Sequence, residues 1–165
     1  MTKLLDFLAR TPVIVFLLVA FVLLGASFYF AEQAVGGPLL DMQMNSADAF
    51  SRLEAMSSEQ KHRHIIATLT LDTFYPLTFG GLLAGIVARF SAQYRRLLVI
   101  PAFVTVIADF AENFVQSLAL SGSTNLLVAK DILTPLKFTS FILATIIALL
   151  VLIFALAKWT RRKRN

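Results

Sequence analysis

Apolar residues are gathered into four long runs, each with few charged side chains inside it. Each run is long enough to cross about 30 Å of hydrocarbon as a helix, which takes roughly 20 residues. Shorter polar segments separate the runs and are typical of connections. The predicted transmembrane helices cover about residues 12–31, 64–88, 97–120 and 135–157.

Turn and cap residues mark several ends of these helices. Gly36 and Pro38 follow the first run, and Gly122 follows the third. Glycine tolerates the left-handed backbone that often ends a helix, and proline cannot continue one. Thr134 is the predicted cap of the fourth helix, with Pro135 in its first turn.

The longest connection, residues 32–63, carries its own helical pattern. Ser46 is a predicted cap, and Phe50, Leu53 and Met56 follow at helical spacing, so residues 46–56 should form a short amphipathic helix. Such a helix would lie on the membrane or over the bundle. The segment 57–60, Ser-Ser-Glu-Gln, has the pattern of a capping box that opens the second transmembrane helix.

The connections at 89–96 and 121–133 are short, so successive helices should pack antiparallel. The expected fold is therefore an all-α membrane protein. It is a four-transmembrane-helix antiparallel bundle in a single membrane domain, residues 1–165, with the short amphipathic helix in the 32–63 loop.

The positions of lysine and arginine predict the orientation. Ten of the fifteen flank the ends on one side of the predicted spans and five lie toward the other. The richer side belongs in the cytoplasm, which puts both termini inside (N-in/C-in) and the 32–63 loop outside. A multi-pass cell-membrane protein, in the bacterial inner membrane, is expected. The first apolar run exceeds the core of about 7–15 residues typical of a signal peptide, so it should remain as a helix.

Composition supports a membrane solvent and removes several classes of function. Apolar residues make up 58% of the chain and charged ones 15%, against about a quarter charged in soluble domains. The absence of cysteine excludes disulfides, thiolate metal sites and dithiol chemistry. The net charge of +5 lies at helix ends, as topology requires, so no nucleic-acid partner is expected.

Three acidic residues lie inside the predicted spans: Asp72, Asp109 and Glu112. Each ionised carboxylate costs about 2.5–3.5 kcal/mol at the centre of a membrane helix, so each should face inward. Asp72 lies about seven residues, or roughly 10–12 Å, from the outer end of its helix. Glu112 lies at nearly the same depth on the next helix, with Asp109 one turn deeper. We therefore predict one shared site in the outer half of the membrane.

The surrounding positions indicate which helix faces meet there. Polar and small residues of the third helix recur at spacings of three and four, which predicts an inward-facing seam. The second helix has a polar stripe from His64 to Tyr75, and Pro76 frees the carbonyl group of Asp72 one turn earlier. Lys137, near the start of the fourth helix, is long enough to reach the acids. The seam comprises Ala102, Thr105, Asp109, Glu112, Gln116 and Ala119, with Asn113 beside it.

From these positions we assign candidate roles. Asp72, Glu112 and Asp109 are the candidate acid/base residues, and at least one should stay protonated because the acids outnumber the nearby bases. His64 has two interpretations, a solvated interface residue or a group at the mouth of the site. No metal site is predicted and no cofactor is indicated. The candidate substrate-binding or orienting residues are Asn113, Gln116, Tyr75, Lys137, Thr68 and His64.

The sequence leaves three functional classes open. The first is a buried carboxylate site that performs acid/base chemistry on a lipid-like or apolar substrate. The second is a proton-coupled small transporter, and the third a structural or assembly subunit whose polar seam binds a membrane-protein partner. In every case we expect the protein to be surrounded by the lipid bilayer. The sequence does not decide whether it is an enzyme.

Overall fold

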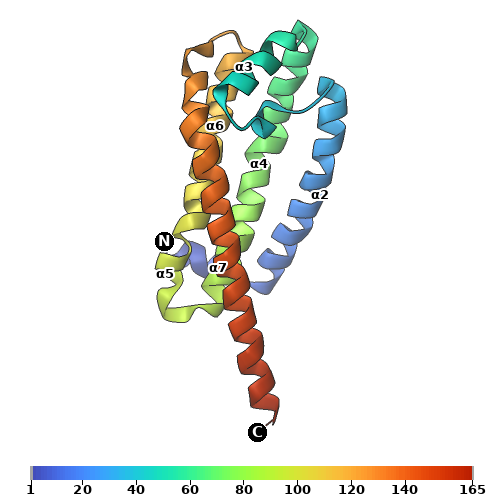
Figure 1. Cartoon of the computed structure of the whole chain (residues 1–165). Helices are drawn as coiled ribbons and strands as arrows, with labels where there is room; N and C mark the ends of the chain where they lie inside the picture. The colour runs from blue at the N-terminus through green and yellow to red at the C-terminus, as the bar shows by residue number, and fades with distance from the viewer. Residues whose placement is uncertain (1, 165) are drawn as a thin grey trace.

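The structure is a computed structural model that describes residues 2–164, and the described chain is helical almost throughout (Figure 1). Four helical stretches are long and apolar enough to span a membrane: Thr11–Val35, Ser58–Phe90, Arg95–Leu120 and Thr124–Arg161. The elements in chain order are α1 (Thr2–Leu8), α2 (Thr11–Val35), the 3-10 helix η1 (Leu40–Met42), α3 (Ser46–Ala55), α4 (Ser58–Phe90), the 3-10 helix η2 (Ala92–Tyr94), α5 (Arg95–Leu98), α6 (Ile100–Leu120), the 3-10 helix η3 (Thr124–Ala129) and α7 (Lys130–Arg164).

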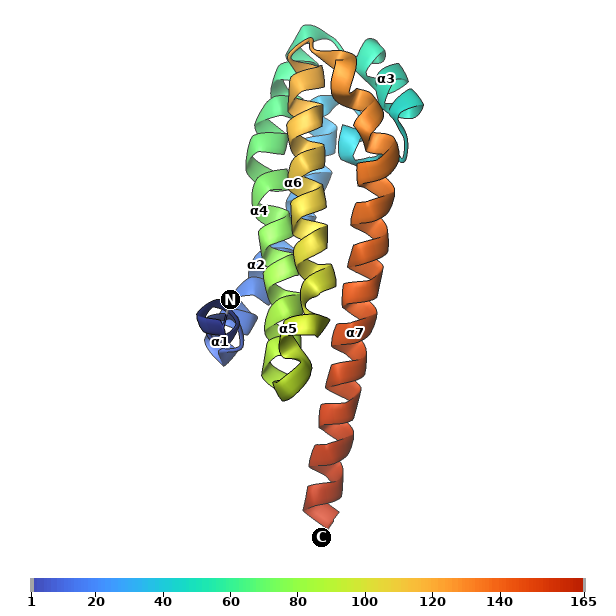
Figure 2. The same cartoon turned by 90° about the vertical axis from the view of Figure 1, so that its left-hand side faces the viewer.

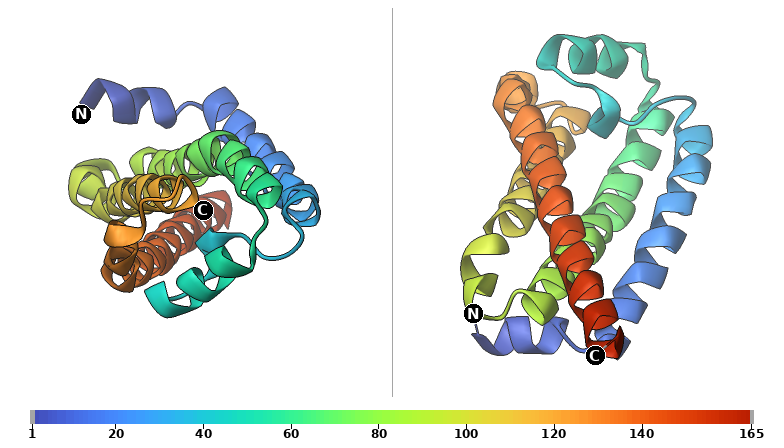
Figure 3. Two further views of the ribbon diagram at one scale, coloured as in Figure 1. Left: turned by 90° about the horizontal axis from the view of Figure 1, so that it is seen from above. Right: turned by 60° about the horizontal axis from the view of Figure 1, so that its bottom comes forward.

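Helices α4, α6 and α7 pack against one another, and α2 lies on the outer side of α4 (Figures 1 and 3). Only Val35, at the end of α2, is fully buried within that helix. A helix that is apolar on all sides and little buried by protein is suited to lipid surroundings. The bundle is thus three packed helices with a fourth attached to one of them.

The two ends of the molecule differ. Both termini lie at one end, where α7 extends beyond the other helices (Figures 1 and 2). Helix α3 and η1 cover the opposite end, here called the α3 end, where Ala49 and Leu53 of α3 are buried against the ends of α2 and α6. The amphipathic helix of the loop therefore packs over the bundle.

Apolar clusters occupy both ends of the interior and leave a polar layer between them. The cluster at the α3 end includes Leu40, Leu53 and Leu127, and the cluster at the other end includes Leu5 and Val87. Along α6, the buried side chains are apolar at the first end, polar in the middle and apolar again at the second end. The buried polar residues between the clusters include Asp72, Thr105, Asp109, Glu112, Lys130, Thr134, Lys137 and Ser140.

Several predicted helix ends are confirmed. Gly36 ends α2 with a left-handed φ of 74°, and Gly122 follows α6 with φ of 103°. Ser57 and Gln60 form the capping box of α4, each side chain accepting from the other residue's backbone N–H.

Other boundaries differ from the predictions. Thr134 does not cap the fourth helix, because α7 begins at Lys130 and Pro135 lies inside it. Asn45, one residue before the predicted Ser46, caps α3 by accepting from the backbone N–H of Asp48. In addition, α1 was not predicted.

Helix α1 is held against α4 by a close backbone approach and against α5 by an ion pair. An added Cβ at Gly85 would lie 2.6 Å from the carbonyl oxygen of Leu8, so only glycine permits this contact. Arg95 pairs with Asp6 at 2.6 Å. Leu5 becomes completely buried between these elements.

Candidate functional site

Glu112 lies at the centre of the polar layer and is completely buried. Its Oε1 atom accepts from the ammonium group of Lys130 and, at 2.5 Å, from the hydroxyl group of Thr134. Its Oε2 atom lies 2.6 Å from Nζ of Lys137. One carboxylate from α6 therefore holds two lysines of α7, which offsets part of the cost of burying all three charges.

These contacts follow from helix periodicity on α7. Lys130, Thr134 and Lys137 are spaced by four and three, so they share one face. That face begins before Pro135 and turns toward α6. Lys130 is fully buried, whereas a position in the loop would have left it in solvent.

Lys137, on α7, contacts three acids from two other elements. Its Nζ atom lies 2.5 Å from Oδ1 of Asp41 in η1 and 4.0 Å from Oδ1 of Asp109 in α6, besides its contact with Glu112. Its side chain is 4% exposed, and that of Asp41 is 19% exposed. The ammonium group thus links the η1 segment to the helix core.

Asp72 projects from α4 toward the same space, but its carboxylate is left without a partner. The residue is 3% exposed, and Oδ2 has no hydrogen bond among the described residues. Its backbone carbonyl, by contrast, accepts from Nδ2 of Asn113 at 2.7 Å. Pro76 cannot donate to that carbonyl, so Asn113 of α6 supplies the missing donor.

His64 is buried in a separate hydrogen-bonded chain. Its Nε2 atom accepts from the backbone N–H of Leu40 at 2.8 Å, and Nδ1 lies 3.1 Å from the hydroxyl of Thr68. His64 has no exposed surface, so its interpretation as a solvated interface residue is wrong. It holds η1, and with it Asp41, over α4.

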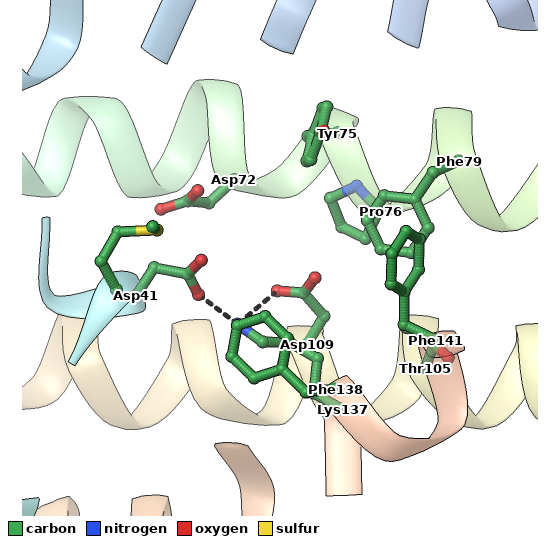
Figure 4. A pocket seen from close by; sticks show the side chains of 11 residues that line it. Asp41, Asp72, Tyr75, Pro76, Phe79, Thr105, Asp109, Lys137, Phe138 and Phe141 are labelled. Atoms are coloured by element: carbon green, nitrogen blue, oxygen red, sulfur yellow. Dashed lines mark hydrogen bonds and ion pairs between the residues drawn. The ribbon is translucent and has the colours of Figure 1, made fainter. Parts of the chain in front are cut away.

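A cavity of about 190 Å³ lies beside the lysine and the acids (Figure 4). Figure 4 shows the carboxyl groups of Asp41, Asp72 and Asp109 turned toward this space, with Phe138 beside Lys137 and the other aromatic side chains farther along α4 and α7. Met42 is 58% exposed, so the cavity is not sealed. The lining residues are Asp41, Met42, Asp72, Tyr75, Pro76, Phe79, Thr105, Asp109, Lys137, Phe138 and Phe141.

The aromatic side of the cavity connects three helices. Tyr75 stacks on Phe21 of α2 at a centroid distance of 5.3 Å and meets Phe79 edge-on at 5.4 Å. Phe79 in turn meets Phe141 of α7 at 5.1 Å. Gly25 of α2 leaves room for the Tyr75 ring, since an added Cβ would already be in van der Waals contact with it at 3.6 Å. Such ring pairs stabilise the packing beyond simple burial.

Three carboxylates come close enough together to be considered as cation ligands. Oxygen atoms of Asp41, Asp109 and Glu112 lie within 4.8 Å of one another. The ammonium group of Lys137 lies among the same three acids. In this arrangement Lys137 supplies the positive charge that a metal ion would otherwise bring.

The structure brings only some of the predicted site residues to the cavity. Asp72, Asp109, Tyr75 and Lys137 line it. Glu112 contacts Lys137 but does not line the cavity, and Asn113 acts on the Asp72 backbone. The remaining three, Gln116, His64 and Thr68, are completely buried away from the lining, and the Gln116 side chain has no hydrogen bond to any described residue.

Two charged residues of the site were not predicted, Asp41 and Lys130. Lys130 lies within the predicted connection 121–133, although its spacing of seven from Lys137 places both on one helical face. Asp41 lies between Leu40 and Met42 in a loop, where nothing in the sequence indicates that the segment folds back over the bundle. An acid flanked by apolar residues was the one available signal.

The fold and these contacts define a helical protein with four candidate membrane spans and a buried acidic cluster. Comparison with protein-family models, with curated proteins and with solved structures found no match. The function must therefore be argued from the site.

Proposed function

We propose that the cavity binds a lipid-like or small apolar substrate and that the carboxyl groups beside it perform acid/base chemistry on that substrate. The observation that carries this proposal is one cavity with two chemically different sides. Asp41, Asp72, Asp109 and Lys137 line one side, and Tyr75, Phe79 and Phe141 line the other. Mostly apolar walls with a few converging polar groups are typical of small-molecule sites.

Each polar residue has a distinct role in this proposal. Asp72 exchanges the proton, because its carboxyl group faces the cavity without an internal partner. Asp109 and Lys137 orient the polar group of the substrate and set the local charge. Glu112 holds Lys137 in place from behind, which changes its predicted role from acid/base residue to positioning residue.

The open side of the cavity indicates how a substrate enters. Met42 at the mouth is exposed, and Tyr75, Phe138 and Phe141 are partly exposed. We propose that the α3 end faces outward, as the charge distribution predicts, so that the substrate enters from the outer half of the bilayer. The corresponding location is a bacterial inner membrane, with both termini in the cytoplasm.

The test is protein-dependent chemistry on membrane lipids. Purified full-length protein in detergent is incubated in deuterium oxide with a total membrane lipid extract, and the lipids are then returned to ordinary water. Deuterium on oxygen or nitrogen is lost in that step, so mass spectrometry finds the species that keep deuterium on carbon or have otherwise changed in mass. Asp72→Asn should lower the rate by about 10²-fold or more, as expected when an acid/base group is lost. Met42→Trp should also lower it by filling the mouth.

Matched controls separate these effects from damage to the fold. Met44 is similarly exposed, at 54%, and does not line the cavity, so Met44→Trp should keep the wild-type rate. Glu54→Gln removes an exposed acid of α3 and should also be neutral. A rate unaffected by both Asp72→Asn and Met42→Trp would contradict the proposed site.

A second candidate, proton-coupled transport, is favoured by the charge balance. Four carboxyl groups, Asp41, Asp72, Asp109 and Glu112, lie near two ammonium groups, Lys130 and Lys137. An excess of buried acids is suited to carrying protons. Transport would appear as pH-dependent flux in liposomes without chemical change, whereas chemistry proceeds in detergent without a gradient.

The third class, an assembly subunit, receives less support from the seam. Glu112, Asn113 and Gln116 are at most 6% exposed within the single chain. Their polar groups are consequently turned toward α4 and α7 and are not presented to a partner helix.

A further inference from the structure

We propose that the ligand of this cavity carries a protonated amine on a compact apolar body, and that the amine binds at Asp72. The inference rests on the proposed function, because it names the substrate class of the same cavity. Charge balance, the unpartnered carboxylate, the aromatic wall and the cavity size support it separately.

Charge is the first argument. The four acids around the cavity and its rear wall exceed the two lysines by two. Buried charges must be paired, neutralised or balanced by an ion. A cationic ligand supplies the missing positive charge, whereas an anionic ligand would increase the imbalance.

The hydrogen bonds show where that charge is missing. Asp41 and Glu112 are already bonded to lysines, and Asp109 lies 4.0 Å from Lys137. Asp72 lines the cavity and is only 3% exposed. One of its carboxyl oxygens, Oδ2, has no hydrogen-bond partner among the described residues. An ammonium group carries only donors, so it matches a carboxylate that accepts nothing from the protein.

The aromatic wall is suited to the same ligand. Tyr75, Phe79, Phe138 and Phe141 present rings to the cavity, and ring faces attract cations. Lys137 already shows this contact, since its Nζ atom lies 5.1 Å from the centroid of the Phe138 ring. The rings also provide apolar surface for the body of an amine.

Size limits the ligand. The cavity of about 190 Å³ is smaller than the roughly 300–1,000 Å³ that surrounds a drug-sized molecule. It therefore accommodates an amine head with a compact body. Any longer apolar tail must leave through the mouth at Met42.

Three probes of nearly equal shape test the charge preference. Aminoadamantane is cationic near neutral pH, adamantanol is neutral and adamantane carboxylate is anionic. Binding to the full-length protein in detergent is measured by calorimetry and by the shift in thermal unfolding. We expect the amine to bind most tightly, the alcohol more weakly and the carboxylate weakest.

Substitutions locate the binding group. Asp72→Asn should weaken amine binding by roughly tenfold or more, since a hydrogen bond between charged groups contributes on that order. It should leave alcohol binding nearly unchanged, which also shows that the variant is folded. Glu54→Gln should affect neither probe.

The outcomes distinguish this inference from the proposed function. If the alcohol binds as tightly as the amine, or if Asp72→Asn does not weaken amine binding, the amine preference is wrong while an apolar substrate site remains. If no probe binds and Met42→Trp has no effect on lipid chemistry, the proposed substrate site is wrong as well.

The amine has two natural sources that a further arm separates. One is the headgroup of phosphatidylethanolamine, and the other is a free amphipathic amine. Micelles containing phosphatidylethanolamine should displace aminoadamantane if the lipid is the ligand, and those containing phosphatidylglycerol should not. If neither lipid displaces aminoadamantane, the ligand is a free amine.

Discussion

Asp72 and Asn113 show how a single missing N–H connects two helices. Pro76 leaves the Asp72 carbonyl without its donor in α4, and Asn113 of α6 donates to it at 2.7 Å. Because of the proline, the backbone carbonyl of Asp72 obtains its hydrogen bond from a neighbouring helix and not from α4 itself. The freed carbonyl was predictable from the proline, but the identity of its new donor was not.

A double-mutant cycle tests this coupling. Asn113→Ala should lower the free energy of unfolding by about 1–3 kcal/mol, because it leaves a buried carbonyl unpaired. In a Pro76→Ala background the loss should be smaller, since position 76 regains an N–H that can donate to the same carbonyl. Unfolding is followed by denaturant titration in mixed micelles. Equal losses in both backgrounds would show that the two residues act independently.

Lys130 illustrates why burial can be hidden in a sequence. Charged residues near a predicted helix end are normally solvated, so a loop position was the reasonable expectation. Burial is tolerated because Glu112, contributed by another helix, accepts from the ammonium group. That compensation depends on two segments 18 residues apart in the chain.

At the level of elements, the docking of α1 depends on a glycine. Gly85 of α4 brings the α1 backbone into contact, and Gly81 one turn earlier faces the flexible side chain of Leu17. Two glycines one helical turn apart let a neighbouring helix approach closely, but their spacing does not identify that neighbour. The backbone contact at Gly85 is made by the N-terminal helix α1, whereas the neighbour at Gly81 is a side chain of the spanning helix α2.

This difference leads to a labelling prediction. The chain contains no cysteine, so a Leu5→Cys variant reports the docking of α1 through its reaction with a water-soluble maleimide. Adding Gly85→Ala should raise the reaction rate by roughly tenfold, equivalent to about 1.4 kcal/mol of docking free energy, because the new Cβ would overlap the Leu8 carbonyl.

Gly81→Ala is the matched control. An added Cβ at position 81 lies 3.2 Å from a methyl group of Leu17, which can move, so the rate should change little. If Gly81→Ala and Gly85→Ala accelerate labelling equally, the close backbone contact does not hold α1.

The η1 and α3 segments act as a cap over the polar layer. His64 holds Leu40, Lys137 holds Asp41, and both carboxyl oxygens of Asp131 accept from Ser46. These contacts come from α4 and α7, so the cap is fixed to the packed core. An element that sequence patterns identify as amphipathic thereby becomes part of the candidate site.

For the whole molecule, the predicted orientation can be tested with single cysteines. Glu54 in α3 and Gln93 in η2 are both exposed and lie at opposite ends. In intact spheroplasts, an impermeant maleimide should label the Glu54→Cys variant and spare the Gln93→Cys variant. Lysis should expose both positions equally. Preferential labelling of Gln93→Cys before lysis would reverse the orientation.

Much of the architecture was predictable because hydrocarbon imposes one simple condition on a chain. Backbone groups must be satisfied within each span, so long apolar runs form helices. Charges inside those runs must face inward, which identified Asp72, Asp109 and Glu112 as residues of one polar layer. The helix ends at Gly36, Gly122 and Ser57 were predictable as well, because they depend only on the backbone and side chains of a few neighbouring residues.

The composition of the buried acidic site was decided by tertiary structure. Asp41 reaches it because a loop folds back over the bundle, and Lys130 because α7 begins earlier than the proline suggested. Both depend on long-range pairing of charges, which no periodicity encodes. The sequence by itself determined four apolar helices with inward acids. Only the folded chain determined that Glu112 holds the lysines and that Asp72 is left facing the cavity.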